Sequence, residues 1–214
     1  MKCFYSLNDQ SWRKMLNLRL DKKTHTYYLD GRPIPGVTGI LEAEGITDFS
    51  MVPEVRLEAS KLFGTATHVA THLYDLGILD WATVSPPIIP YLNGWIKFLK
   101  DYNIKKHEHI EKIIYSRIWN FAGTLDRINR PNNKLTVIDL KTPTSVSPGN
   151  FLQTGAYKIG YEEMTGERIK QRWIVQLKPE GYKIHPCTAT SDESVFKALA
   201  LTHNWKLLNL KRRN

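Results

Sequence analysis

The sequence lacks any long apolar run. No stretch approaches the ~18 apolar residues of a membrane-spanning helix, so we expect no membrane partner. The opening stretch, MKCFYSLNDQSWRKMLNLRL, has no apolar core of the kind found in secretory signal peptides. It carries scattered Lys and Arg with few acids, which leaves an organellar presequence open.

Cysteine is nearly absent. Cys3 and Cys187 are the only two in 214 residues, too few for a four-cysteine zinc site or an iron–sulfur cluster. Two thiols so far apart also indicate a reducing compartment rather than a disulfide framework. We expect an intracellular protein in the cytoplasm of a bacterial host or phage-infected cell, with a mitochondrial location as the alternative.

Acidic residues are in the minority. The chain has 30 Lys and Arg against 21 Asp and Glu, which gives a formal net charge of +9 and a pI near 9.5. This excess favours a polyanionic partner, nucleic acid before an anionic surface, although a merely basic protein is the alternative. Hydrophobic residues make up 42% of the chain, so it can form a packed core.

The pattern of elements predicts an α/β fold. From Glu111 onward, two strands bend near Asn120, a third carries VIDLKT, a helix ends at Gly166, and the turn KPEG joins a hairpin before a last helix. This order, β-β-β-α-β-β-α, is typical of a central mixed β-sheet flanked by helices. Thr190 and Glu193 have the spacing of a capping box at the start of the last helix.

The front half of the chain is predicted to be mostly helical. A hairpin turning at Asp30-Gly31 is followed by a helix from about Pro53 to Gly77 and by an amphipathic helix, YLNGWIKFLKDYN. No linker separates this half from the rest, so a single domain is expected. The expected domain is residues 1–214, comprising the front half 1–110 and the α/β core 111–214.

Three charged residues stand in otherwise apolar strands. The stretch FAGTLDRINRPNNKLTVIDLKT holds Asp126, Asp139 and Lys141. Side chains alternate along a strand, so Asp139 and Lys141 share a face, about 6.5–7 Å apart, and Asp126 lies beside Asp139 if the strands pair. Two close carboxylates repel each other, and Mg²⁺ or Mn²⁺ removes that cost. The alternative is an Asp139–Lys141 ion pair at the surface.

Four short motifs occur in a fixed order. They are GTATH (Gly64–His68), GTLD (Gly123–Asp126), DLK (Asp139–Lys141) and QTGAY (Gln153–Tyr157). In this order they resemble the PD-(D/E)XK nuclease superfamily, in particular its RecB-like and phage-type exonuclease branch, to which mitochondrial genome maintenance exonucleases are similar. The resemblance spans roughly residues 24–187 and implies a restriction-endonuclease-like core. Asp126 follows a leucine rather than a proline, as is ordinary in this branch.

The resemblance also implies roles for individual residues. The metal ligands would be His68, Asp126, Asp139 and the backbone carbonyl of Leu140. Lys141 would act with Asp126 and Asp139 in catalysis, by orienting the attacking water and stabilising charge on the phosphate. Residues that would contact DNA or support these groups are Gln153, Tyr157, Glu111, Gly64 and Thr142.

The implied activity is that of a Mg²⁺- or Mn²⁺-dependent DNA exonuclease, a phosphodiester hydrolase acting in DNA recombination, repair or replication. Its partners would be DNA, single-stranded or with free ends, and a single-strand-binding or annealing protein. The sequence has no G-x-x-x-x-G-K-[ST] pattern, and too few cysteines for the iron–sulfur cluster of some relatives, so a stand-alone nuclease is favoured. The alternatives are a structure-specific endonuclease and a catalytically silent nucleic-acid-binding module of the same fold.

The front half would roof the cleft, and two of its features have alternative interpretations. His68 lies on the polar side of its helix with Gly64, Thr71 and Asp75, opposite an apolar stripe that includes Val69 and Leu76. His68 either lines the cleft or lies on a solvated face. A zinc site is not favoured, because the segment HVATH lacks the glutamate of the H-E-x-x-H motif. Three aromatics either stack unpaired bases or simply pack their helix: Tyr91, Trp95 and Phe98.

Overall fold

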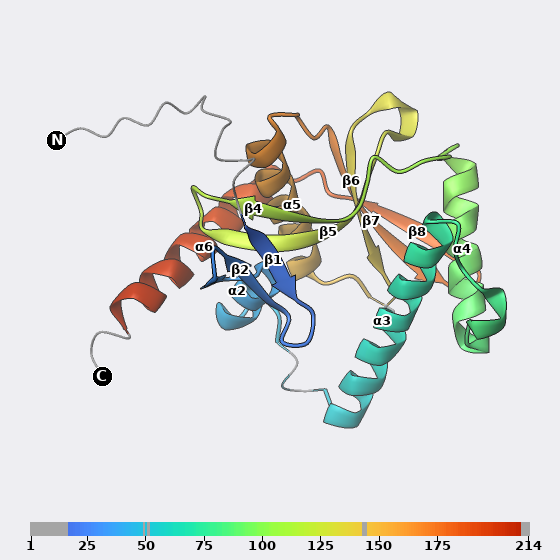
Figure 1. Ribbon diagram of the computed structural model, residues 1–214, viewed down its shortest axis with the longest axis horizontal. Coiled ribbons are helices and arrows are strands. Elements are labelled where there is room, and N and C mark those ends of the chain that lie inside the picture. Colours follow the sequence, from blue (N-terminus) through green and yellow to red (C-terminus); the bar gives the residue numbers. More distant parts are fainter. Residues whose placement is uncertain (1–16, 49, 51, 143–144, 211–214) are drawn as a thin grey trace.

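A five-stranded mixed sheet organises the computed structural model, which describes residues 17–48, 50, 52–142 and 145–210 (Figure 1). Its strands lie in chain order, and all neighbours are antiparallel except β6 and β7, which are parallel. The parallel pair needs a crossover connection, which the helix α5 provides. The elements are β4 (His109–Ser116), β5 (Phe121–Asn129), β6 (Thr136–Lys141), α5 (Pro148–Thr165), β7 (Gln171–Lys178) and β8 (Gly181–Pro186). This order confirms the α/β prediction.

A small three-stranded antiparallel sheet precedes the large one. It consists of β1 (Leu18–Asp21), β2 (Thr26–Leu29) and β3 (Arg32–Ile34). The hairpin predicted at Asp30-Gly31 is confirmed, with φ of 49° and 80° at its two central residues, as a tight hairpin turn requires. The first strand, β1, was not predicted. The small sheet joins the large one through a parallel bridge between Gly36 and Ala122.

Helices cover both faces of the large sheet. On one face, α2 (Val37–Ala43), α5 and α6 (Ser191–Asn209) pack on apolar side chains of β4, β5 and β6. On the other face, α4 (Ile89–Asp101) packs on β7 and β8 and on apolar side chains of β6. The long helix α3 (Glu54–Asp75) packs mainly against α4 and projects from the body at its N-terminal end (Figure 1). Three short 3-10 helices complete the described elements: η1 (Trp81–Thr83), η2 (Pro86–Ile88) and η3 (Pro131–Asn133).

One open alternative is settled, and one sequence-based expectation is wrong. Trp95 and Phe98 are fully buried between α4 and the sheet, which confirms the interpretation in which they pack their helix and excludes stacking on unpaired bases. The capping box expected at Thr190 and Glu193 is absent: the Thr190 side chain makes no capping hydrogen bond, and the Glu193 side chain forms an ion pair with Lys158. A capping box is present at the start of α5, between Ser147 and Asn150.

Some sequence features lie outside the described residues. They are Cys3, most of the opening stretch and the basic end of the chain. The other cysteine, Cys187, is described and is a buried free thiol. Within the part of the chain that the structure describes, no helix combines the length and the apolarity needed to cross a membrane.

Candidate active site

The pairing of β5 with β6 stops at two aspartates. Arg127 pairs with Ile138, so the next step along both strands brings Asp126 opposite Asp139. The backbones do not pair there; instead, the Leu140 N–H donates a hydrogen bond to Asp126 Oδ2 at 2.7 Å. The N–H and C=O of one strand residue point to the same edge, so the Leu140 carbonyl also faces β5. The predicted pairing of the two carboxylates is thus confirmed, with a break in the ladder beside them.

The ladder is interrupted on the other side of Asp126 as well. Ile110 pairs with Arg127 and Lys112 with Leu125, which leaves Glu111 opposite Asp126 without a backbone pair. Glu111 has a φ of 49°, a left-handed conformation that is rare for a glutamate inside a strand. Three acidic residues therefore occupy one row across β4, β5 and β6.

This irregularity changes the faces of β5. Residues two apart in a strand normally share a face. Leu125 packs in the core under α5, whereas Arg127 lies over the ring of Trp95 on α4. The strand therefore twists locally at Asp126, a distortion that the sequence pattern did not predict.

Asp139 and Lys141 form a buried pair. Lys141 Nζ lies 2.8 Å from Asp139 Oδ2, and the two side chains are 17% and 1% exposed. The alternative of a surface ion pair is therefore wrong. Burial raises the pKa of Asp139 to about 6, opposed by Lys141 and aided by Asp126. Burial favours a lower pKa for Lys141, but the Asp139 and Asp126 carboxylates outweigh it and raise that pKa, so the ammonium stays charged.

His68 reaches the same place from α3. Its Nδ1 lies 3.7 Å from Asp126 Oδ2, and the side chain is partly buried. One turn earlier, a Cβ at Gly64 would lie 3.4 Å from Thr142 Oγ1, so this glycine adjoins the residue after β6. The interpretation in which His68 lines the cleft is supported, and the solvated-face alternative is not.

Gln153 and Tyr157 approach from α5. Gln153 Nε2 donates to Tyr157 Oη at 2.7 Å, and both side chains are buried. Burial and the nearby Asp139 and Asp126 carboxylates raise the pKa of Tyr157 well above its ordinary value, so its hydroxyl stays protonated. A Cβ at Gly123 would come within 3.0 Å of the Tyr157 ring, which explains why the strand carries glycine there.

These groups surround one cavity of about 240 Å³. Predicted residues lining it are Gly123, His68, Glu111, Asp126, Lys141, Gln153 and Tyr157, while Asp139 is fully buried. The sequence analysis missed the contribution of the small sheet and of α2. Those additional lining residues are Leu20, His25, Tyr27, Val37 and Thr38. They are joined by Thr124 on β5, whose Oγ1 lies 2.9 Å from Tyr27 Oη. His25, Tyr27, Val37 and Thr38 lie in the segment HTYYLDGRPIPGVTGIL, whose pairing across the chain is a tertiary feature that local sequence does not reveal.

The donor set fits a hard divalent cation. Carboxylate and carbonyl oxygens suit Mg²⁺ and Mn²⁺. Both Asp139 oxygens are buried and accept no hydrogen bond of good geometry. His68 contacts Asp126, and Asp139 contacts Lys141, but no three His, Cys, Asp or Glu side chains among the described residues form one compact cluster. Of the predicted ligand side chains, His68 and Asp126 thus form one pair, whereas Asp139 is paired with Lys141.

Comparisons with known proteins identify no family. Neither a protein-family description nor a curated protein matches the chain. Among the solved structures, 19 chains match. One of them is the crystal structure of SSO0001, which is 20% identical with a TM-score of 0.36, over 65% of this chain and 70% of that chain.

Proposed function

We propose that this protein is a Mg²⁺- or Mn²⁺-dependent DNA nuclease with the restriction-endonuclease-like core of the PD-(D/E)XK superfamily, acting as an exonuclease. The observation that carries the proposal is the convergence of Asp126, Lys141 and His68 on one cavity, with the buried Asp139 carboxylate held against Lys141. They come from β5, β6 and α3, and no packing requirement of an apolar core explains a buried carboxylate beside a buried ammonium.

The residues that would hold the ion are His68, Asp126, Asp139 and the Leu140 carbonyl. When bound, such an ion supplies Lewis-acid charge and a water of lowered pKa. The other roles belong to side chains of the protein. Lys141, charged and held by Asp139, would face a phosphate oxygen and stabilise the charge that develops on it. Tyr157, protonated and held by Gln153, offers a hydroxyl donor on the same wall.

The walls of the cavity support cleavage from DNA ends. The small sheet contributes Leu20, His25 and Tyr27, and α3 contributes His68, so elements of the front half flank the catalytic groups. Figure 1 shows the small sheet beside α3 in front of the large sheet. A flanked cavity admits a strand end more readily than an unbroken duplex. With a net charge of +9, binding to DNA should weaken steeply with salt.

The deciding experiment compares end-labelled linear DNA with a covalently closed circle of the same sequence, in Mg²⁺ and in Mn²⁺. We expect the linear DNA to shorten from its ends and the circle to survive. Nicking or linearisation of the circle would favour the structure-specific endonuclease. Binding of both DNAs without cleavage in either metal would favour the catalytically silent binding module. Only shortening of the linear DNA from its ends would be consistent with an exonuclease role in recombination, repair or replication, with an annealing or single-strand-binding protein as partner.

A further inference from the structure

The helix that carries His68 is lightly attached to the large sheet. Its apolar contacts are with α4 and η2, in a small cluster around Ala70, Ile88 and Leu92. Other apolar side chains on α3 are left in solvent, among them Leu62 (72% exposed) and Val69. The position of His68 relative to β5 is therefore not fixed by a hydrophobic face, and another contact must set it.

Asp75, the last residue of α3, makes such a contact. Its side chain is completely buried, and Arg127 Nε donates to Oδ2 at 2.6 Å. Trp95 Nε1 donates to Oδ1 at 2.8 Å, and His107 Nε2 lies 3.1 Å from the same oxygen. Asn129 in turn contacts His107. One carboxylate at the end of α3 is thus held by groups from α4, β5 and the segment before β4.

Arg127 connects this anchor to the candidate site. Its side chain is 1% exposed, and Nη1 donates at 2.8 Å to the carbonyl oxygen of Asp126. Asp126 lies at the break in the ladder on both sides. The backbone of Asp126 is therefore held by the neighbouring guanidinium rather than by a strand partner.

We infer that Asp75 and Arg127 are positioning residues that dock α3 on β5 and so set the distance from His68 to Asp126. Asp75 follows His68 by seven residues, two helical turns, so both lie on one face of α3. Arg127 follows Asp126 directly. Two contacts therefore join the same two elements: His68 to Asp126 at 3.7 Å, and Asp75 to Arg127 at 2.6 Å. The consequence for metal binding rests on the proposed function, whereas the docking role does not.

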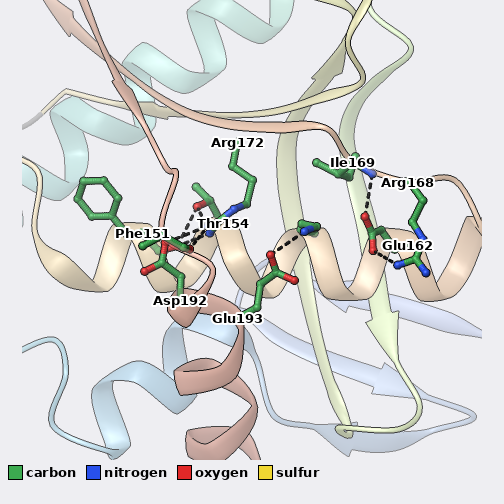
Figure 2. Close-up of polar contacts among 10 residues, drawn as sticks. Phe151, Thr154, Glu162, Arg168, Ile169, Arg172, Asp192 and Glu193 are labelled. Carbon is green, nitrogen blue, oxygen red and sulfur yellow. Dashed lines mark hydrogen bonds and ion pairs between the residues drawn. The ribbon is translucent and has the colours of Figure 1, made fainter.

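The chain offers a matched control. Arg172 on β7 forms a comparable buried pair with Asp192 on α6 at 3.0 Å, with side chains 5% and 12% exposed. Figure 2 shows Arg172 reaching Thr154, Phe151 and Asp192. None of these residues lines the candidate active-site cavity. Asp192→Asn should lower the free energy of unfolding, as Asp75→Asn does, because each variant leaves an arginine without its buried carboxylate. Unlike Asp75→Asn, it should leave α3 in place.

A cross-link reports the docking of α3 directly. Cysteines at Gly64 and Thr142 fall near disulfide range, about 3.5–4.5 Å between Cβ atoms, because a Cβ at Gly64 would lie 3.4 Å from Thr142 Oγ1. The double variant Gly64→Cys/Thr142→Cys, in a Cys3→Ser background, is oxidised under fixed conditions and the rate is measured. We expect Asp75→Asn to slow the oxidation and Asp192→Asn to leave it unchanged.

Calorimetry with Mn²⁺ alone gives the second measurement. Groups that orient metal ligands are worth about 10–100-fold in affinity, and we expect a loss of that order in Asp75→Asn. Oxidising the cysteine pair in that variant should restore most of the affinity, which a general loss of stability would not do. Arg127→Lys keeps the charge but cannot hold both Asp75 and the Asp126 carbonyl. It should behave like Asp75→Asn, and it serves in its place if that variant does not fold.

The outcomes separate the two proposals. Unchanged oxidation and unchanged Mn²⁺ affinity in folded Asp75→Asn and Arg127→Lys would overturn the positioning role. Equal slowing by Asp192→Asn would overturn it too, since the effect would then be general. If oxidation depends on Asp75 while the parent neither binds Mn²⁺ nor cleaves DNA, the docking role stands and the nuclease proposal fails.

Discussion

Asp126 accepts a hydrogen bond from the backbone N–H of Leu140 instead of pairing with Asp139 across the strands. The bond fixes one oxygen of Asp126 beside the buried Asp139 carboxylate, whose own oxygens accept no hydrogen bond of good geometry. Burying this carboxylate with the Lys141 ammonium, 2.8 Å from Oδ2, as its partner is costly for folding alone. It becomes reasonable if the carboxylate serves a cation, and the predictions below test that interpretation.

Lys141 is expected to act on the reacting phosphate rather than on DNA binding, because its ammonium is held beside Asp139 inside the cavity. Lys141→Ala should lower the single-turnover cleavage rate by about 10²–10⁴-fold with little change in DNA affinity. Lys134→Ala, which removes an exposed lysine from the turn before β6, is the control and should cleave normally. A Lys141→Ala rate within a few-fold of the parent's would contradict the assignment.

The carboxylates should dominate metal binding. Asp126→Asn and Asp139→Asn each remove a negative ligand, so both should weaken Mn²⁺ binding in calorimetry. His68→Ala should weaken it less, because an imidazole carries no negative charge and lies 3.7 Å from Asp126. Asp101→Asn, which removes the charge of a surface carboxylate held by Lys97 and Tyr182, controls for lost charge. Equal Mn²⁺ affinity in the parent and both site variants would remove the proposed metal site.

Metal affinity should also depend on pH. The pKa of Asp139 is raised from its model-compound value of 3.8 to about 6 in the folded protein, chiefly by burial. A carboxyl with a raised pKa holds its proton until the pH exceeds that value, and a protonated carboxyl is a poor ligand. Mn²⁺ affinity should therefore be full above about pH 7 and decline as the pH falls through 6.

The same shift has a consequence for the metal-free protein. Folding takes up a proton on Asp139 between pH 3.8 and about 6, so this group's contribution to stability is present at the lower value and is lost as the pH rises through 6. Urea unfolding of the parent and of Asp139→Asn across this range isolates that contribution. Circular dichroism at each pH establishes that the protein remains folded. A constant Mn²⁺ affinity from pH 5 to pH 8 would contradict either the raised pKa of Asp139 or its role as a ligand.

Local patterns predicted most of the fold because most of its elements follow local rules. The break at Asn120, the helix end at Gly166 and the turn at Asp30-Gly31 each carry a residue suited to a left-handed backbone, and each is observed where expected. Strand β1 was missed because LRLD is short and gains its stability from pairing with β2, which local sequence does not reveal.

Helix α3 shows where the periodicity rule fails. The rule assigns the apolar stripe to the protein and the polar stripe to solvent. Here Val69 and Leu76 are exposed, while Asp75 is buried and His68 partly so. The polar face turns inward because its partners are polar, namely Asp126 and Arg127. Such inversions are expected at functional sites, since the requirements of a site can override those of packing.

The distortion around Asp126 was also beyond sequence reasoning. A regular strand pattern predicts Asp126 beside Asp139, and that much is correct. It does not predict the left-handed conformation at Glu111 or the twist that sends Leu125 and Arg127 to opposite faces. The twist places Arg127 beside Asp75, a buried partner from elsewhere in the chain that a local pattern does not reveal.

The last prediction concerns Glu111 and separates stability from function. A non-glycine residue in the left-handed region costs about 1–2 kcal/mol, and glycine adopts it without that cost but loses more chain entropy on folding. Glu111→Gly should therefore raise the free energy of unfolding by about 0.5–1 kcal/mol, measured by urea denaturation.

Asn103, with a φ of 51° after α4, provides the control, and Asn103→Gly should stabilise the protein slightly without affecting cleavage. If the strained backbone serves to hold the Glu111 carboxylate opposite Asp126, Glu111→Gly should lose cleavage activity and Mn²⁺ affinity while gaining stability. A more stable variant with unchanged cleavage and metal affinity would show that the distortion serves Asp126 alone, and a less stable variant would show that the Glu111 backbone is not strained.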